Sequence, residues 1–237
     1  MSRKKVAIHQ PDFMPWLGFF KKISVADVFV VLDHTKNNPR DANFWCRRVK
    51  LCVQGKEYWF SVTLKKPKGV IGQKINEMEV LKQNPANIKK LMKTIEQSYG
   101  KAPFYGDFVD YICEYFDHHS LRLLTRNMKF IERVMEALDL RPEIIYSSTL
   151  APIGSSTEML VDLVEKVGGG TYISGVGAKN YQDESLFEKK NIHLTYSEFR
   201  PTTYTQINSD KFIPGLSVID ALMNIGADET KSIITRT

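Results

Sequence analysis

The sequence predicts an α/β protein with a doubly wound, mostly parallel, Rossmann-like sheet. Short apolar runs without polar alternation, such as residues 27–33, recur along the chain, and they are typical of strands buried on both faces. Helix-forming segments separate these runs, as in sheets whose parallel strands are joined by crossover helices. Residues 84–140 break the rhythm with three helical patterns in succession. We therefore expect one α/β domain over residues 1–237, with an inserted, mainly helical block at about 84–140.

The first elements predict a parallel βαβ unit. A buried strand is expected at Val6–His9, a short helix at Leu17–Val25 and a second strand at Asp27–Asp33. A turn-rich segment with two prolines joins the first strand to the helix. Two further strands, at Arg48–Gln54 and Glu57–Leu64, are expected to pair around the short turn between them.

The inserted block begins with a helix-start signal at Asn84-Pro85, where asparagine suits the N-cap and proline the first helical position. Apolar residues then recur on one helical face at positions 88, 91, 92 and 95. A second helix is predicted at Phe108–Phe116. A third spans Leu121–Leu138, where apolar residues alternate at three- and four-residue spacing.

The last third of the chain returns to alternating strands and helices. Strands are predicted at 143–147, 171–174 and 192–196, with helices ending at 167 and covering 183–189. Ser155 and Glu158 have the spacing of a capping box, which predicts a side-chain cap on the first of these helices. A short final helix is expected at Val218–Met223, with Ser217 as its N-cap. The sheet would then have about five strands.

Composition narrows the partners that the protein can have. The chain has 237 residues, a net charge of +6 and a pI of about 9.1, which fits either a solvated lysine surface or an anionic partner. Such a partner would be a nucleotide sugar or an acidic carrier. The basic residues do not interleave with aromatic ones as they do on a nucleic-acid platform, so no nucleic-acid partner is expected.

The cysteines and apolar runs exclude several other classes. Three cysteines without a C-x-x-C motif argue against a disulfide framework and a zinc knuckle. No spacing of histidines and carboxylates specifies a ligand set, so we expect no metal site. The chain shows no apolar run of membrane-spanning length and no signal core, so we expect a cytoplasmic protein without an integral membrane segment. The sequence specifies neither a cofactor nor an oligomeric state.

Ligands of open α/β sheets bind beyond the carboxyl ends of the strands, which selects candidate residues directly. His9 and Gln10 end the first strand and Asp33 ends the second, so we expect His9 and Asp33 to be catalytic. The following loop carries Asp12 and Trp16, and its prolines suit a rigid substrate-binding segment. The alternative is a histidine bonded to turn backbone and a tryptophan that anchors packing.

Three further groups are candidates for binding an anion. Gly18 opens a helix whose N-terminus can accept a phosphate, unless the glycine serves only close packing of Trp16. In the loop after a later strand, Lys179 would supply catalytic charge, or would be an exposed lysine in a plain turn. Its expected substrate-binding neighbours are Ser174, Gly175, Gly177 and Tyr181. A basic group that would clamp phosphate, or would form a solvated strand edge, comprises Arg47, Arg48 and Lys50.

Several stretches, in order along nearly the whole chain, resemble the WbqC-like family. Residues 8–20, with Gln-Pro, Pro-Trp and Gly-aromatic steps, are similar to the opening signature of that family, and residues 26–33 match its next block. Later matches are Tyr172–Gly175, Gly177–Lys179, Tyr181, Tyr204, Gln206, Phe212, Leu216-Ser217, Asp220 and Gly226. The chain departs from the family at Cys46-Arg47, where an Asn-Arg pattern is usual.

This resemblance implies a role in bacterial O-antigen or related surface-glycan biosynthesis. The implied reaction transfers an acyl or aminoacyl group, for example glycyl, to a nucleotide-linked amino-sugar, with acyl-CoA, an acyl carrier protein or ATP as donor. A weaker similarity to adenylyl-transferring enzymes of the pantothenate synthetase type suggests a nucleotidyltransferase-like fold and an ATP-dependent, amide-forming ligase. Residues 16–19 lack the histidines of that signature. A non-catalytic nucleotide-sugar-binding module in a glycan-assembly complex is the remaining alternative.

Overall fold

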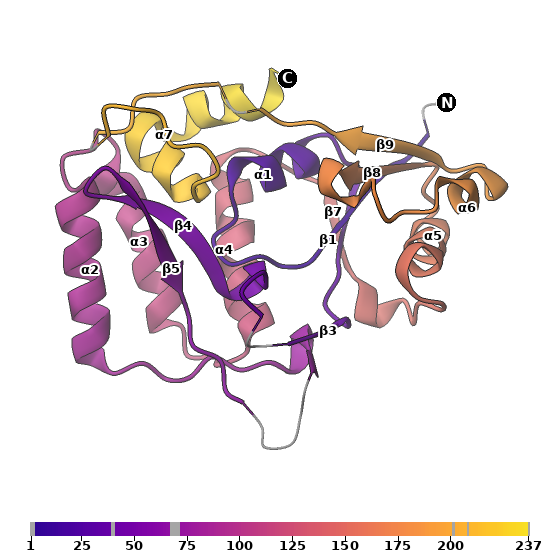
Figure 1. Ribbon diagram of the computed structural model, residues 1–237, viewed down its shortest axis with the longest axis horizontal. Coiled ribbons are helices and arrows are strands. Elements are labelled where there is room, and N and C mark those ends of the chain that lie inside the picture. The colour runs from indigo at the N-terminus through magenta and orange to yellow at the C-terminus, as the bar shows by residue number, and fades with distance from the viewer. Residues whose placement is uncertain (1–2, 39–40, 67–71, 201, 208, 237) are drawn as a thin grey trace.

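A five-stranded parallel sheet forms the centre of the molecule (Figure 1). The computed structural model describes residues 3–38, 41–66, 72–200, 202–207 and 209–236. The sheet order is β7-β2-β1-β8-β9, and each neighbouring pair is parallel. Its strands are β1 (Lys5–His9), β2 (Val28–Val31), β7 (Glu143–Tyr146), β8 (Thr171–Gly175) and β9 (His193–Ser197). The predicted doubly wound α/β fold is confirmed.

The two faces of the sheet belong to different hydrophobic cores. Ala7, Phe29 and Val31 pack into the core that contains α1 (Leu17–Ser24) and α7 (Val218–Thr235). Val6 and Ile8 point to the other face, where α5 (Ser156–Lys166) and α6 (Glu184–Lys189) cover the sheet. Because successive side chains of a strand alternate between faces, both sets must be apolar. This explains why these strands appear as unbroken apolar runs in the sequence.

The predicted helical region forms a layer beside the sheet (Figure 1). Its helices are α2 (Pro85–Tyr99), α3 (Tyr105–Asp117) and α4 (Leu123–Ala137). Asn84 caps α2 by accepting a hydrogen bond from the Ala86 amide at 2.9 Å, as predicted. The predicted hairpin is also present: β4 (Arg48–Val53) and β5 (Lys56–Ser61) pair in antiparallel register.

Short elements connect these layers. A two-residue antiparallel pair, β3 (Lys36–Asn37) and β6 (Gln73–Lys74), was not predicted, because two residues carry no readable periodicity. Single 3₁₀ turns are η1 (Trp45–Arg47), η2 (Ile75–Glu77), η3 (Ser147–Thr149) and η4 (Val176–Ala178). Two of them, η3 and η4, directly follow strands of the main sheet and shape its carboxyl edge.

One prediction about a helix cap is wrong, and one helical segment was not predicted. Ser155 occupies the N-cap of α5 but makes no side-chain cap bond, because Ser156 adopts a left-handed φ of 49° and distorts the first turn. The predicted helix from Val218 is broken at Gly226, shortly after the expected end at Met223, because Gly226 has a non-helical φ of 76° and ψ of 177°; a second helical segment then continues α7 to Thr235. A Cβ at Gly226 would lie 2.9 Å from the Phe104 ring, so glycine permits both the kink and the close approach.

Candidate functional site

A cleft opens at the carboxyl edge of the sheet, at the point where successive strands begin to be added on the other side of β1. Counted in chain order, the strands of the main sheet run 3-2-1-4-5, so β1 has its successor β2 on one side and β8 on the other. This is the topological switch point at which open α/β sheets bind ligands. The cleft has a volume of about 590 Å³. It is lined in part by the predicted residues His9, Gln10, Asp12, Ser174, Gly175, Gly177 and Tyr181.

The helical layer fixes the loop that follows β1. Asn127 of α4 is fully buried, and its Nδ2 donates to the Pro11 and Cys46 carbonyls, both at 2.7 Å. Tyr115 of α3 donates its hydroxyl hydrogen to Asn127 Oδ1 at 2.8 Å. These bonds satisfy the buried amide and lock the loop against η1. The inserted helices therefore position the site, although they supply none of the groups at its floor.

A lysine and an aspartate form the buried floor of the cleft. Lys22 is 5% exposed and Asp12 is 8% exposed. Lys22 Nζ donates to the Ile8 carbonyl at 3.0 Å, so α1 holds the amine against the end of β1. Burial lowers the pKa of Lys22 and raises the pKa of Asp12, each to about 7, and the attraction between the two charges opposes both shifts. Both groups are therefore suited to exchange protons near neutral pH.

His9 stands beside this floor as a neutral imidazole. Burial, then the charge of Lys22, holds the pKa of His9 well below its usual value. Its Nδ1 lies 2.9 Å from the Gln10 carbonyl, which can only accept, so Nδ1 carries the proton in the neutral ring. The other nitrogen, Nε2, is then left with its lone pair. The pKa of about 3 keeps His9 neutral, with Nε2 as a hydrogen-bond acceptor, but makes the imidazole a weak base.

Cys46 is fully buried behind this floor, does not line the cleft and offers no nucleophile. Its Sγ lies 3.7 Å from Asp12 Oδ1 and 3.8 Å from Gln10 Oε1. Burial and the nearby Asp12 carboxylate raise the pKa of the thiol well above its usual value. A thiol that stays protonated donates to Asp12 and does not attack a substrate.

The loop after β8 forms the opposite wall. Ser174 is buried and donates its hydroxyl hydrogen to Gln182 Oε1 at 2.9 Å. A Cβ added at Gly175 or Gly177 would meet no atom within 4 Å, as expected for positions that border open space. Lys179 is outside the cleft lining, with Nζ 5.8 Å from the centroid of the Tyr196 ring. The structure therefore brings the glycines of this loop to the site and leaves its lysine apart.

Asp33 lies at the carboxyl end of β2 but is engaged in structural hydrogen bonds. It is 2% exposed, and its carboxylate accepts from Ser147 Oγ at 2.9 Å, from the Ser148 amide at 2.8 Å and from Ser148 Oγ at 2.6 Å. These bonds join the ends of β2 and β7. Asp33 does not line the cleft, so its predicted catalytic role gains no geometric support.

Trp16 and Gly18 pack on each other away from the cleft. A Cβ at Gly18 would lie 2.2 Å from the Trp16 ring, so the indole covers the first turn of α1. Trp16 also meets Phe199 edge-on at 5.8 Å between centroids. Gly18 therefore serves close packing of Trp16, which was the alternative to a phosphate-binding role. Neither residue lines the cleft.

The three basic residues before and within β4 also lie outside the cleft lining. The Arg48 guanidinium stacks 3.5 Å above the Trp59 ring, and Lys50 pairs with Glu57 at 2.6 Å. Arg47 donates to the Asp41 carbonyl at 3.4 Å. Their neighbour Trp45 does line the cleft and was not predicted.

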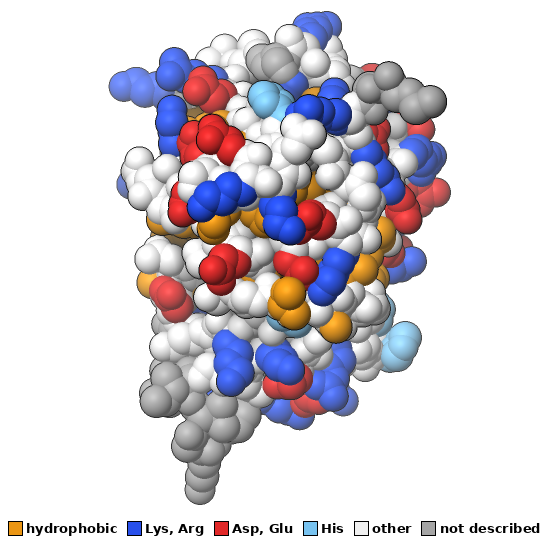
Figure 2. Space-filling model, turned by 90° about the vertical axis from the view of Figure 1, so that its right-hand side faces the viewer, with side chains coloured by type: hydrophobic (Ala, Val, Ile, Leu, Met, Phe, Trp, Pro, Cys, Tyr) orange, Lys and Arg blue, Asp and Glu red, His pale blue; other side chains and the backbone are white. Residues whose placement is uncertain are grey.

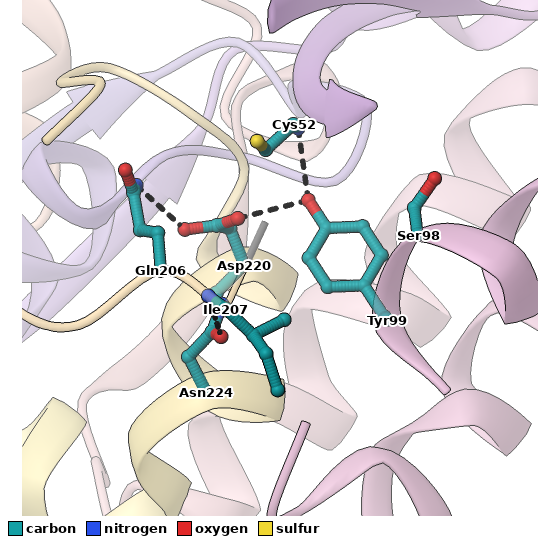
Figure 3. A pocket seen from close by; sticks show the side chains of 7 residues that line it. All are labelled: Cys52, Ser98, Tyr99, Gln206, Ile207, Asp220 and Asn224. Atoms are coloured by element: carbon teal, nitrogen blue, oxygen red, sulfur yellow. Dashed lines mark hydrogen bonds between the residues drawn. The ribbon is translucent and has the colours of Figure 1, made fainter. Parts of the chain in front are cut away.

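A second group of buried polar residues has no room for a ligand. Asp220 is fully buried and accepts hydrogen bonds from Tyr99 at 2.8 Å and from Gln206 at 2.9 Å (Figure 3). It also accepts one from Tyr204 at 2.7 Å. The space beside it is too small to hold a water molecule. Burial raises the pKa of Asp220, and the three donors oppose that rise. We interpret this network as an internal clamp between α7, α2 and the segment before α7.

Lys22 is the residue of the floor that sequence reasoning missed. A signal was present, because α1 links two neighbouring buried strands and carries Leu17, Phe19, Phe20 and Ile23, all buried. A buried lysine is rare, and this apolar stretch holds two, because Lys21 is buried as well. The pattern therefore indicates the pair, and only the structure shows that Lys22 reaches the cleft.

The described residues show neither a membrane-spanning helix nor a cluster of metal ligands. No helix among them is long and apolar enough to cross a membrane. Nor do they contain a group of three or more His, Cys, Asp and Glu side chains that could hold a metal ion. On the face around α5 and α6, cationic and anionic side chains alternate (Figure 2). That face therefore has no continuous basic patch.

Comparisons with known proteins identify the family of the chain. The model of the WbqC-like protein family matches residues 10–232. The chain is also similar to the uncharacterized protein Rv1507c of Mycobacterium tuberculosis, with 27% identity over 227 residues and 95% of each chain covered. No solved structure matches the chain. Because the family match includes the loop after β1, the β8 loop and α7, the chain belongs to the WbqC-like protein family.

Proposed function

We propose that this protein is an acyl or aminoacyl transferase, for example of glycyl groups, that acts on the amino group of a nucleotide-linked sugar in surface-glycan (O-antigen) biosynthesis. The observation that carries the proposal is the neutral His9 beside buried Lys22 and Asp12, at the floor of a cleft at the switch point of the sheet. The pathway is what the family resemblance implies. Nucleotide sugars and acyl donors are made in the cytoplasm, so we propose that location too.

His9 is available as the base in amide formation because its imidazole is neutral, and its pKa of about 3 suits it to pass a proton on rather than to hold it. The amine of the sugar attacks the acyl carbonyl, the N–C bond forms, and the amine must lose a proton. His9 Nε2 accepts that proton and returns it to the leaving thiolate or phosphate as the C–S or C–O bond breaks. His9 is thus restored to its neutral form, and no oxidant or reductant is needed.

Lys22 is suited to bind negative charge in this reaction. A protonated amine in a buried site interacts strongly with an anion, because little water screens the charge. Such an anion is a phosphate of the substrate or the oxyanion that develops on the acyl carbonyl. Binding an anion also raises the pKa of Lys22 and so stabilises its charged form.

An ATP-dependent ligase is the second candidate. The 3-2-1-4-5 strand order is shared with sheets that bind nucleotides at the switch point. In that reaction a carboxylate is first activated by ATP, and the same base then serves amide formation. The donor distinguishes the candidates: acyl-CoA or an acyl carrier protein for the first, a free acid with ATP for the second.

Product formation tests the proposal. Purified protein is screened by thermal shift against nucleotide sugars, acyl-CoAs and ATP, and the stabilising pairs are incubated and analysed by mass spectrometry. We expect an acylated amino-sugar nucleotide from wild type, and its loss in His9→Ala but not in the control His193→Ala, which alters an exposed histidine of β9. Stabilisation by none of these compounds refutes the proposal. Clean binding of a nucleotide sugar without product, with every donor supplied, identifies a non-catalytic binding module instead.

A further inference from the structure

Two partly exposed tryptophans meet at the rim of the cleft. Trp45 of η1 is 46% exposed and Trp59 of β5 is 40% exposed, and their ring centroids lie 5.6 Å apart at an angle of 36°. The chain has only three tryptophans. Indole rings are usually buried or used at interfaces, so an exposed pair beside a cleft indicates a binding surface.

Hydrogen bonds hold the backbone of Trp45 in this position, and its ring packs against Trp59. The Trp45 carbonyl accepts a hydrogen bond from the Phe13 amide at 3.0 Å, which ties η1 to the loop after β1. The next residue, Cys46, is fully buried, and Asn127 donates to its carbonyl. Trp45 lines the same cleft as His9 and Asp12. An aromatic ring that is already ordered loses little entropy when a ligand stacks on it.

Trp59 and Arg48 support Trp45 from the hairpin. The Arg48 guanidinium lies 3.5 Å from the centroid of the Trp59 ring, a close cation–π stack. Arg48 Nε is buried and finds no hydrogen-bond partner among the residues that the structure describes. An arginine held by stacking keeps its charge beside the ring pair, where it attracts an anionic ligand.

We propose that Trp45 is the base-stacking subsite of this cleft, and that it takes the nucleobase of a nucleoside-diphosphate substrate. The inference rests on the proposed function and adds the orientation in which the nucleotide sugar lies in the cleft. The groups that handle protons lie on the buried floor, so the amino-sugar must reach that floor. The base is at the opposite end of a nucleotide sugar and therefore reaches the exposed rim, where Trp45 lies. A bare indole face suits a planar base, and stacking is tolerant of base identity.

Titration calorimetry with defined ligands tests this orientation. The probes are UDP-N-acetylglucosamine, the diphosphates UDP, dTDP, CDP, ADP and GDP, and N-acetylglucosamine 1-phosphate, which has no base. For the diphosphates that bind wild type, Trp45→Ala should raise Kd by about 10- to 100-fold, while Trp45→Phe should keep most of the affinity. Affinity for the sugar phosphate should change less than twofold. The control is Tyr58→Ala, because Tyr58 is 51% exposed on the same hairpin and does not line the cleft.

Each other outcome overturns the inference in a distinguishable way. If wild type binds diphosphates and Trp45→Ala binds them equally well, the base does not stack on Trp45 and the proposed function survives. If Trp45→Ala loses the sugar phosphate and the diphosphates alike, Trp45 contacts the sugar and the orientation is reversed. If wild type binds none of the probes, the proposed function fails together with this inference.

Discussion

Replacing Lys22 with methionine should make the protein more stable and inactive at the same time. The side chains have similar length, so the change removes a buried charge without leaving a large cavity. The pKa of Lys22 falls from 10.5 to about 7 on folding, which corresponds to a cost of about 5 kcal/mol for keeping the amine charged. Methionine escapes that cost but leaves the Ile8 carbonyl without its donor, a loss of about 1–3 kcal/mol. We expect a net gain of about 2–4 kcal/mol at pH 7.

The pH dependence of this gain follows from the sign of the shift. The folded pKa of Lys22 lies below its unfolded value, so between about pH 7 and 10.5 the unfolded chain binds more protons, and wild-type stability rises with pH from this group. Asp12 has the opposite effect. Its pKa is raised from 3.8 to about 7, so its contribution to stability falls as the pH rises from about 3.8 to about 7. The advantage of Lys22→Met should therefore be largest near and below pH 7, and should shrink toward pH 10.

Urea unfolding at pH 7 and pH 10, with turnover measured on the same preparations, tests this reasoning. Lys89→Met, at an exposed position of α2, is the matched control and should change neither quantity by much. Turnover of Lys22→Met should fall by at least about 100-fold, because a buried cation that binds charge is lost. A variant that is less stable than wild type at pH 7 and keeps its turnover would refute the assignment of Lys22 as a functional, strained cation.

Three further predictions follow from the same geometry. His9→Ala should lower turnover by about 10²–10⁴-fold while the melting temperature changes little, and near-normal turnover would make His9 structural. Gly18→Ala should cost about 1–3 kcal/mol in urea unfolding, because the new methyl group would displace the Trp16 ring, and unchanged stability would contradict the packing. Asp220→Ala should cost about 3–5 kcal/mol, because Tyr99, Tyr204 and Gln206 lose their common acceptor; a melting temperature near wild type would show that water replaces the carboxylate.

Local patterns were enough to predict the sheet and most helices. Strands buried on both faces have no polar positions, and the runs around residues 6–9 and 27–33 are of that kind. Asn84 was identifiable as a cap because its side chain bonds to an amide only two residues away. Ser155 and Glu158 had an equally clear capping-box spacing, but the left-handed φ of Ser156 prevents the side-chain cap. A cap depends on local dihedral angles that composition alone does not specify.

The edge of the sheet that carries the site was also predictable, because parallel strands present their carboxyl ends together. His9, Gln10, Asp12 and the glycines of the β8 loop do line the cleft, as expected from their places at strand ends. Position at a strand end does not determine which way a side chain points. Asp33 turns to Ser147 and Ser148, and Lys179 lies over Tyr196. Long or polar side chains choose among nearby partners that come from distant parts of the chain.

The sequence by itself therefore determined the fold class, the edge of the sheet at which the cleft opens and the family resemblance, because these depend on periodicity and on short motifs. Only the tertiary structure decided that buried Lys22 and Asp12 form the floor of the cleft, with His9 beside them. It also placed Trp45 at the rim, through bonds from Phe13 and Asn127. Burial and charge coupling arise only when segments that are remote in sequence exclude water together. The pKa values that suit these groups to proton transfer are thus a property of the packing and cannot be derived from any single segment.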